Sequence, residues 1–312
     1  MELYFAPMEG VTDFTFRMLH RKYYGGLDRY YIPFLTPTQH HHLAPKERRE
    51  VLPEHNPDML AVPQLLTKNS DDFNWAAREL RDLGYGMVNL NLGCPSGTVV
   101  PKGKGAGFLA FPDRLDAFLE EIFSADVLPV SIKTRLGMRE PEEFARIMEI
   151  FARYPLAELI LHPRTREEMY QGPLHRDWYE QARRRFSCPV CYNGELKTVP
   201  ELTEMAQAPA APQAAMIGRG LIADPALALR FRGGTVKPGT LAEFDKELGE
   251  AYLERFGSRK NALMRMKHLW SYWLQNHPDG AEQWKKMRKC NDWTVFRALG
   301  RELLSEGDWH RE

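Results

Sequence analysis

The run Leu3-Tyr4-Phe5-Ala6 lies near the start of the chain, and Pro7-Met8-Glu9-Gly10 follows it directly. Short apolar runs of this kind predict β-strands. In a doubly wound α/β sheet, the first strand normally leads into a glycine-rich turn of the form G-x-G-x-x-G that binds phosphate. Pro7–Gly10 does not have that pattern, which favours a parallel barrel over a doubly wound sheet.

Similar runs recur before residue 220 and are separated by segments with helical periodicity. The expected strands are Leu3–Ala6, Arg29–Pro33, Met59–Leu65, Met87–Leu92, Pro129–Lys133, Glu158–Leu161, Val190–Tyr192 and Ala215–Ile217. The expected helices between them are Ser70–Leu83, Asp113–Phe123, Pro141–Arg153, Trp178–Phe186 and Val199–Ala206. Alternating strands and helices predict parallel βαβ units. Eight strands in about 220 residues match the size of a (β/α)₈ TIM barrel.

The pattern changes after Asp224, where only helices are expected. These are Leu241–Phe256, Asn261–Gln275, Ala281–Lys289 and Val295–Ser305. The segment 232–239 contains three glycines and a proline, so it predicts a domain boundary. We therefore expect a barrel over residues 1–235 and a small helical bundle over residues 240–312.

The charge of the chain is unevenly distributed. Lysine plus arginine and aspartate plus glutamate both number 42, so the net charge is zero, which argues against a protein that coats nucleic acid. From Arg255 onward, 12 basic residues stand against 7 acidic ones, a balance of +5. This excess indicates a polyanionic partner at the C-terminal end, although solvated helix faces produce the same pattern.

Several classes of protein are excluded by the sequence. No run of eighteen apolar residues is present, which excludes a spanning helix. The segment Met1–Pro7 lacks the basic flank and apolar core of a signal peptide. Four cysteines do not make a disulfide framework in a chain of this length, so we expect a protein of the reducing cytoplasm.

Polar residues gather where the expected strands end. The carboxyl ends of barrel strands form the active-site face of this fold. Buried polar groups are costly unless they are paired, so their convergence predicts a ligand site there. The residues, from strand three to strand eight, are Gln64; Asn91 and Cys94; Lys133 and Arg135; His162 and Arg164; Asn193, Gly194 and Glu195; and Gly218, Arg219 and Gly220.

The loops after strands seven and eight commonly hold phosphate in this fold, through backbone amides and a short helix. Gly194 and Gly218 let the backbone approach phosphate oxygens closely, and Arg219 adds positive charge. Lys133 suits the pyrimidine ring of a flavin, because a cation stabilises the negative charge of the reduced ring.

Six motifs resemble, in order, those of the tRNA-dihydrouridine synthases. They are Ala6–Asp13 with Phe16-Arg17; Asn91–Ser96 with Gly103–Gly107; Ser131–Gly137; Leu161–Thr165; Tyr192–Glu195; and Met216–Gly220. The resemblance runs from residue 4 to about residue 225. Arg265–Trp270 is also similar to a segment of the family's helical domain. The shared order makes the match specific.

The resemblance implies that NADPH reduces FMN and that hydride passes from flavin N5 to C6 of a uridine in the tRNA D-loop, flipped out of the tRNA fold. It implies that Cys94 donates the proton to C5, and an unperturbed thiol with a pKa near 8.5 still carries its proton at pH 7. The implied FMN contacts are Pro7, Met8, Gln64, Lys133, His162, Asn193, Gly194, Glu195, Gly218 and Arg219.

The resemblance also assigns the substrate. Asn91 would hold the edge of the target uracil, and tRNA contacts are expected from Lys102, Lys104, Arg135, Arg164, Arg265 and Lys267. We expect a monomer that needs neither a membrane nor a metal. The sequence departs from the family at Asn89, where aspartate is usual, at Ile32-Pro33-Phe34, and at Pro163, where glycine is usual.

Two alternatives share part of this pattern. One is an FMN-dependent oxidoreductase for small pyrimidines, of the dihydroorotate type, which does not need a basic helical end. The other is a non-catalytic tRNA-binding module with a relict flavin site.

Cys188 and Cys191 have the C-x-x-C spacing of zinc and redox sites. Side chains three apart on a strand face opposite sides, so we do not expect such a site here. His40-His41-His42 cannot easily converge on one ion, so we expect an exposed loop there.

Overall fold

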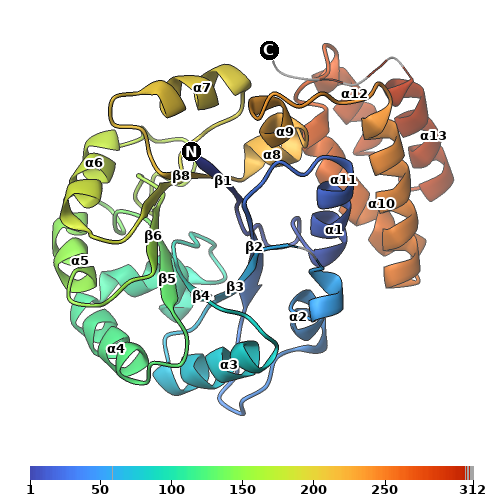
Figure 1. Ribbon diagram of the computed structural model, residues 1–312. Coiled ribbons are helices and arrows are strands. Elements are labelled where there is room, and N and C mark those ends of the chain that lie inside the picture. Colours follow the sequence, from blue (N-terminus) through green and yellow to red (C-terminus); the bar gives the residue numbers. More distant parts are fainter. Residues whose placement is uncertain (58, 306, 308, 310–312) are drawn as a thin grey trace.

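The computed structural model describes residues 1–57, 59–305, 307 and 309. Eight parallel strands form a closed barrel in the order β1 to β8, which confirms the predicted TIM barrel (Figure 1). Both ends of every strand lie within two residues of the prediction. The strands are β1 Glu2–Phe5, β2 Arg29–Leu35, β3 Ala61–Leu65, β4 Val88–Leu92, β5 Val130–Thr134, β6 Glu158–Leu161, β7 Val190–Tyr192 and β8 Ala214–Ile217.

Helices surround the barrel (Figure 1). They are α1 Phe14–Tyr23, α2 Pro45–Glu50, α3 Ser70–Asp82, α4 Pro112–Ser124, α5 Glu143–Phe151, α6 Arg176–Arg185, α7 Val199–Gln207, α8 Arg219–Ala223 and α9 Leu227–Phe231. Three short 3₁₀ turns add η1 Pro53–His55, η2 Val100–Lys102 and η3 Gly105–Ala110. The five predicted barrel helices are present as α3 to α7.

Helix α1 was not predicted, and its burial pattern gives the reason. Thr15, Arg17 and His20 are buried together with Phe16 and Leu19. Polar residues on the inner face interrupt the apolar period by which an amphipathic helix is recognised. The start of α1 is set by Asp13, whose side chain accepts a hydrogen bond from the Phe16 amide at 3.1 Å.

The inside of the barrel is filled by a small apolar cluster and a buried carboxylate. Tyr4 and Tyr31 belong to this cluster. Glu158, the first residue of β6, accepts hydrogen bonds from the Tyr31 hydroxyl at 2.6 Å and the Tyr4 hydroxyl at 3.0 Å. These bonds close the end of the barrel where the strands begin. Ligands therefore have access from the opposite end.

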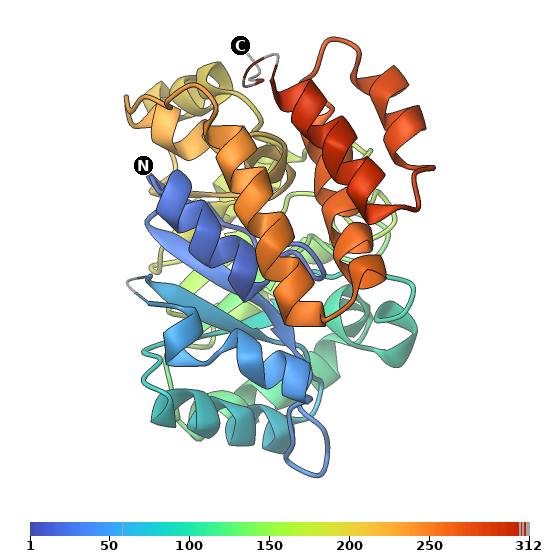
Figure 2. The same ribbon diagram turned by 90° about the vertical axis from the view of Figure 1, so that its right-hand side faces the viewer.

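Four helices follow the barrel (Figures 1 and 2). They are α10 Thr240–Phe256, α11 Arg259–Trp273, α12 Gly280–Met287 and α13 Trp293–Leu304, which confirms the predicted helical end. Helix α10 packs against α1 and α11 packs against α8, while α12 and α13 pack on these two C-terminal helices. Phe244 packs edge-on against Phe16 at 5.6 Å, so one apolar core continues from the barrel into these helices. The expected bundle ran to residue 312, and residues 306, 308 and 310–312 lie outside the described part of the chain. Every described helix is too short or too polar to cross a membrane.

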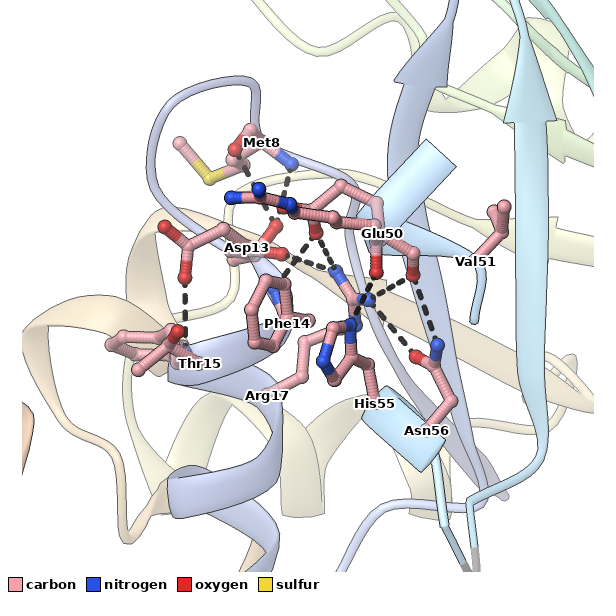
Figure 3. A network of polar contacts seen from close by, with 12 residues as sticks. Met8, Asp13, Phe14, Thr15, Arg17, Glu50, Val51, His55 and Asn56 are labelled. Carbon is pink, nitrogen blue, oxygen red and sulfur yellow. Dashed lines mark hydrogen bonds and ion pairs between the residues drawn. The ribbon is translucent and has the colours of Figure 1, made fainter. Parts of the chain in front are cut away.

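The fully buried guanidinium of Arg17 ties three segments together (Figure 3). Its Nη1 donates to the Thr12 carbonyl at 2.8 Å and to Glu50 Oε2 at 3.0 Å. Its Nη2 donates to the Glu50 carbonyl and to Asn56 Oδ1, both at 2.9 Å. A buried charge is tolerated only with such partners, so α1, α2 and η1 must fold together.

The same network reaches the C-terminal helices. Arg255 of α10 donates to Glu50 Oε1 at 3.0 Å and lies 3.2 Å from Asp13 Oδ2. Arg265 of α11 lies 3.6 Å from the same Asp13 oxygen. The Tyr252 hydroxyl donates to Asp13 Oδ1 at 3.1 Å. The loop between β1 and α1 is thus held from both sides.

Replacing Glu50 with leucine removes the carboxylate that neutralises Arg17. Because an unpaired charge would remain buried, we expect the free energy of unfolding to fall by about 3–5 kcal/mol. Urea denaturation measures the loss. Glu282→Gln is the control, because it breaks an exposed pair with Lys286 within α12 and should change stability little. Equal losses in the two variants would contradict a structural role for the Arg17 network.

Candidate active site

A cavity of about 510 Å³ opens at the carboxyl ends of the strands, and all eight strands or the loops after them contribute to its wall. The structure brings thirteen of the expected site residues together on this wall. They are Pro7, Met8, Gln64, Asn91, Cys94, Lys133, Arg135, His162, Asn193, Gly194, Glu195, Gly218 and Arg219. The volume lies within the ordinary range for ligand pockets.

A chain of side-chain amides crosses β3, β4 and β5 beneath this cavity. Asn89 Nδ2 donates to Ser131 Oγ at 2.9 Å, and Asn89 Oδ1 accepts from Gln64 Nε2 at 2.7 Å. Gln64 Oε1 in turn accepts from Asn91 Nδ2 at 2.7 Å. Asn91 Oδ1 then accepts the amides of Gly93 at 3.0 Å and Cys94 at 2.9 Å. The chain fixes the backbone that carries Cys94.

The loop of Cys94 is also held by the glycine-containing segment Gly103–Gly107. The Cys94 carbonyl accepts from the Ala106 amide at 3.1 Å. Gly105 has φ +56°, and a Cβ there would lie 2.9 Å from the Cys94 carbonyl oxygen, so only glycine fits without displacement. Burial raises the pKa of the Cys94 thiol, although Lys133 and Arg135 act in the opposite direction. The side chain is therefore a neutral thiol at pH 7.

Positive charge lies beside the Cys94 loop on the neighbouring strand β5, and a hydrogen-bond acceptor follows after β6. Burial lowers the pKa of Lys133 to about 8, and the charge of Arg135 acts in the same direction. Burial also lowers the pKa of His162 well below its ordinary value, so its ring is neutral. His162 Nδ1 donates to the Asn193 carbonyl at 2.6 Å, which leaves Nε2 as an acceptor with no partner among the described residues.

The loops after β7 and β8 form a cationic end of the cavity. Glu195 pairs with Lys197 at 3.4 Å, with Arg164 at 3.6 Å and with Arg219. These three cations lower the pKa of the Glu195 carboxyl despite its partial burial. One carboxylate against three cations leaves a surplus of positive charge. This end can therefore bind an anion such as phosphate.

The cavity wall also includes residues that lie outside the six motifs and were not expected at the site, among them Met169, Tyr170, Leu196, Lys197, His268 and Tyr272. Tyr170 is 45% exposed, and its ring lies 4.7 Å from the Arg219 guanidinium and 5.1 Å from that of Arg135. His268 and Tyr272 come from α11, so the C-terminal helices form part of the wall. Their spacing of four residues on one helix face was visible in the sequence, but nothing in it indicated that this face meets the barrel.

Five expected substrate contacts are not part of this wall: Lys102, Lys104, Arg164, Arg265 and Lys267. Arg164 is buried and donates to the Gly172 carbonyl at 2.5 Å. Lys267 donates to the Arg288 carbonyl at 2.9 Å, and Arg265 is engaged by Asp13. Lys102 and Lys104 flank Gly103, next to the loop that covers Cys94. Arg135, though on the wall, donates to the carbonyls of Gly93, Thr165 and Met169.

Cys188 and Cys191, the two cysteines at C-x-x-C spacing, lie in different environments. Cys191 is inside the barrel within the apolar cluster, whereas Cys188 precedes β7 and is half-buried. Within the described part of the chain, we find no group of three His, Cys, Asp or Glu residues able to hold a metal ion.

Sequence comparison gives a family. The family model described as Dihydrouridine synthase (Dus) matches residues 4–298. The tRNA-dihydrouridine(16) synthase of Ralstonia nicotianae is 31% identical over 302 residues, which cover 93% of this chain and 92% of that protein. The enzyme of the same name from Cupriavidus necator is 29% identical, with 93% of each chain covered. The tRNA-dihydrouridine synthase B of Pasteurella multocida is 27% identical over 72% of this chain and 66% of its own.

Structural comparison agrees on the architecture. Morphinone reductase superposes with a TM-score of 0.54 at 16% identity, covering 76% of this chain and 87% of its own. An old yellow enzyme homologue from Zymomonas mobilis gives a TM-score of 0.55 at 13% identity, covering 78% and 95%. At these identities the likeness concerns the barrel fold.

Replacing Asn89 with leucine should break the amide chain and leave Gln64 Nε2 without an acceptor. We expect a loss of about 1–3 kcal/mol in the free energy of unfolding, measured in urea. Asn89→Asp is the matched variant, because its two oxygens can accept from Gln64 and from the Ser131 hydroxyl. A smaller loss is expected for it. If leucine is tolerated as well as aspartate, the chain does not support the Cys94 loop.

Proposed function

The chain belongs to the dihydrouridine synthase family, and we propose that it reduces the C5–C6 double bond of a uridine in tRNA, with FMN as cofactor and NADPH as reductant. The observation that carries this proposal is the neutral Cys94 thiol, fixed by Asn91 in one cavity with Lys133 and His162. Such a cavity offers a proton donor and an anion-stabilising cation on neighbouring strands.

The cavity fits a flavin mononucleotide in its chemistry. The cations around Glu195, with Gly194 and Gly218, suit its phosphate, and Lys133 suits the pyrimidine end of the ring. The unpartnered His162 Nε2 can accept a hydrogen bond from a bound ligand. When bound, FMN supplies the hydride that adds to C6 of the uracil.

Cys94 completes the reduction by giving its thiol proton to C5 of the uracil. The S–H bond breaks, a C–H bond forms, and the resulting thiolate regains a proton from solvent. Burial keeps the thiol protonated beforehand, since it raises the Cys94 pKa. Asn91 holds the Cys94 amide, and its second Nδ2 hydrogen remains available for the uracil edge.

We propose that residues 1–235 act as the catalytic barrel and that residues 240–312 bind tRNA. Arg265 and Lys267 are engaged by other segments of the protein, whereas four cations on and directly after α12 are exposed. They are Lys285, Lys286, Arg288 and Lys289. A cationic, phosphate-binding surface of this kind makes tRNA binding sensitive to salt. Lys102 and Lys104 would add contacts beside the Cys94 loop.

Position 16 of tRNA is the first uridine to test, since two of the relatives named above are tRNA-dihydrouridine(16) synthases. The relative named synthase B shows that the family has other members, so the test maps dihydrouridine along the whole tRNA. The competing function is reduction of a free pyrimidine. Comparable NADPH-dependent turnover of free uridine and unmodified tRNA would favour that alternative.

Replacing Cys94 with alanine should leave flavin content and NADPH oxidation intact and should lower dihydrouridine formation by about 10²–10⁴-fold, the usual contribution of a general acid. The measurement is dihydrouridine per tRNA under NADPH. Cys290→Ala is the control, because Cys290 is half-buried outside the cavity. Unchanged turnover in Cys94→Ala would remove this residue from the mechanism.

Lys133 should make flavin retention depend on pH. Its ammonium is charged below a pKa of about 8 and neutral above it, so stabilisation of an anionic ligand is present at low pH and lost as pH rises through that value. The negative charge is that of the reduced ring, so flavin content after anaerobic dialysis of the reduced protein, read by absorbance on reoxidation, should fall above about pH 8. Lys133→Arg should flatten this dependence, because arginine stays charged. The same fall in both proteins would assign the effect to another group.

A further inference from the structure

A second, smaller cavity adjoins the first at its cationic end. We call it the annex; its volume is about 320 Å³, and it lies between α8 and α11, which pack side by side (Figure 1). Lys197, Arg219 and Tyr272 line both cavities. At about 30 Å³ per water in the liquid, the annex has the space of about ten water molecules. A molecule bound in the main cavity could therefore extend into it.

The remaining wall of the annex is polar and comes largely from α11. Ser271, Gln275 and Asn276 lie on it, together with Tyr272. Gln275 Nε2 donates to the Ser271 carbonyl at 3.1 Å, and Asn276 Nδ2 donates to the Ala223 carbonyl at 2.7 Å. Both amides thus keep their oxygens as acceptors. Acceptors of this kind suit sugar hydroxyls, which can donate.

The charges at the annex leave one cation suited to a phosphate. Asp224 lines the annex, but its carboxylate pairs with Arg230 and accepts the Ala226 amide. Arg219 stands between the two cavities, with its guanidinium on the Tyr170 ring and against Glu195. The Lys197 side chain is 37% exposed and shares Glu195 with two arginines. Lys197 can therefore meet a phosphate at the entrance.

We propose that the annex binds the ribose and phosphate of a nucleotide whose other part occupies the main cavity. This rests on the proposed function, in which two ligands carry that chemistry. One is NADPH, whose adenosine half must lie somewhere beyond the cavity when its nicotinamide enters it. The other is the nucleotide next to the target uridine in tRNA. The aromatic ring of Tyr170 at the cavity mouth offers a stacking surface to either ligand.

The test separates the two half-reactions of the intact flavoprotein. Ser271→Phe fills the annex, and Gln275→Leu removes one of its hydrogen-bond acceptors; both residues line the annex and not the main cavity. Met264→Phe is the control, because Met264 is 64% exposed on the same helix and lines neither cavity. In the first arm, NADPH reduces the flavin anaerobically without tRNA, and its apparent Kd is measured from the loss of absorbance. In the second arm, photoreduced protein is reoxidised by tRNA at increasing concentration.

Both annex variants should weaken one ligand by about threefold to tenfold, the loss expected for one hydrogen bond, with flavin content unchanged. Weakening in the first arm alone assigns the annex to NADPH, and weakening in the second alone assigns it to tRNA. Wild-type affinities in both arms would overturn the inference, and so would losses that match those of Met264→Phe. Absence of dihydrouridine formation by the unaltered protein would instead refute the proposed function.

Discussion

The guanidinium of Arg17 is fully buried, and much of the molecule is arranged to make that burial possible. Its charge needs Glu50, which fixes α2 against α1, and Glu50 in turn accepts from the Phe14 amide and from Arg255. Transferring a charge from water into the protein interior is costly, so a buried guanidinium is stable only when all of its hydrogen-bonding and ionic partners are present. The carboxylate that fixes α1 therefore also holds the C-terminal helices against the barrel.

The site follows from a second constraint, which is geometrical. Parallel strands bring their carboxyl ends to one rim, so the alignment of the strands alone brings together residues that are distant in the chain. The amide chain from Ser131 to Asn91 uses this alignment, because each link bridges neighbouring strands. Rigid strands thus hold the loop of Cys94, while Gly105 allows the covering segment to approach it.

Most of the barrel and its rim could be predicted from local patterns. Strands such as Glu158–Leu161 are short apolar runs that need no tertiary information, and the polar residues after them mark one face. Helix α1 was missed because Arg17 and His20 occupy its inner face, and their partners lie far along the chain. His268 and Tyr272 were missed for the same reason, since the docking of α11 determines their place. Arg265 and Lys267 read as free surface charges, yet both are engaged by other segments.

Helix α11 is at once part of the C-terminal bundle and part of the cavity wall, through His268 and Tyr272. An exchange of the C-terminal helices between two relatives would therefore alter the chamber in which reduction takes place, as well as the surface offered to RNA. A chimera with lost turnover would not reveal which of the two had failed. A change at Tyr272 of α11 also has to be compatible with Tyr170 and Arg219, which line the same cavity. The barrel and the C-terminal helices thus build one chamber together, and neither part forms its wall alone.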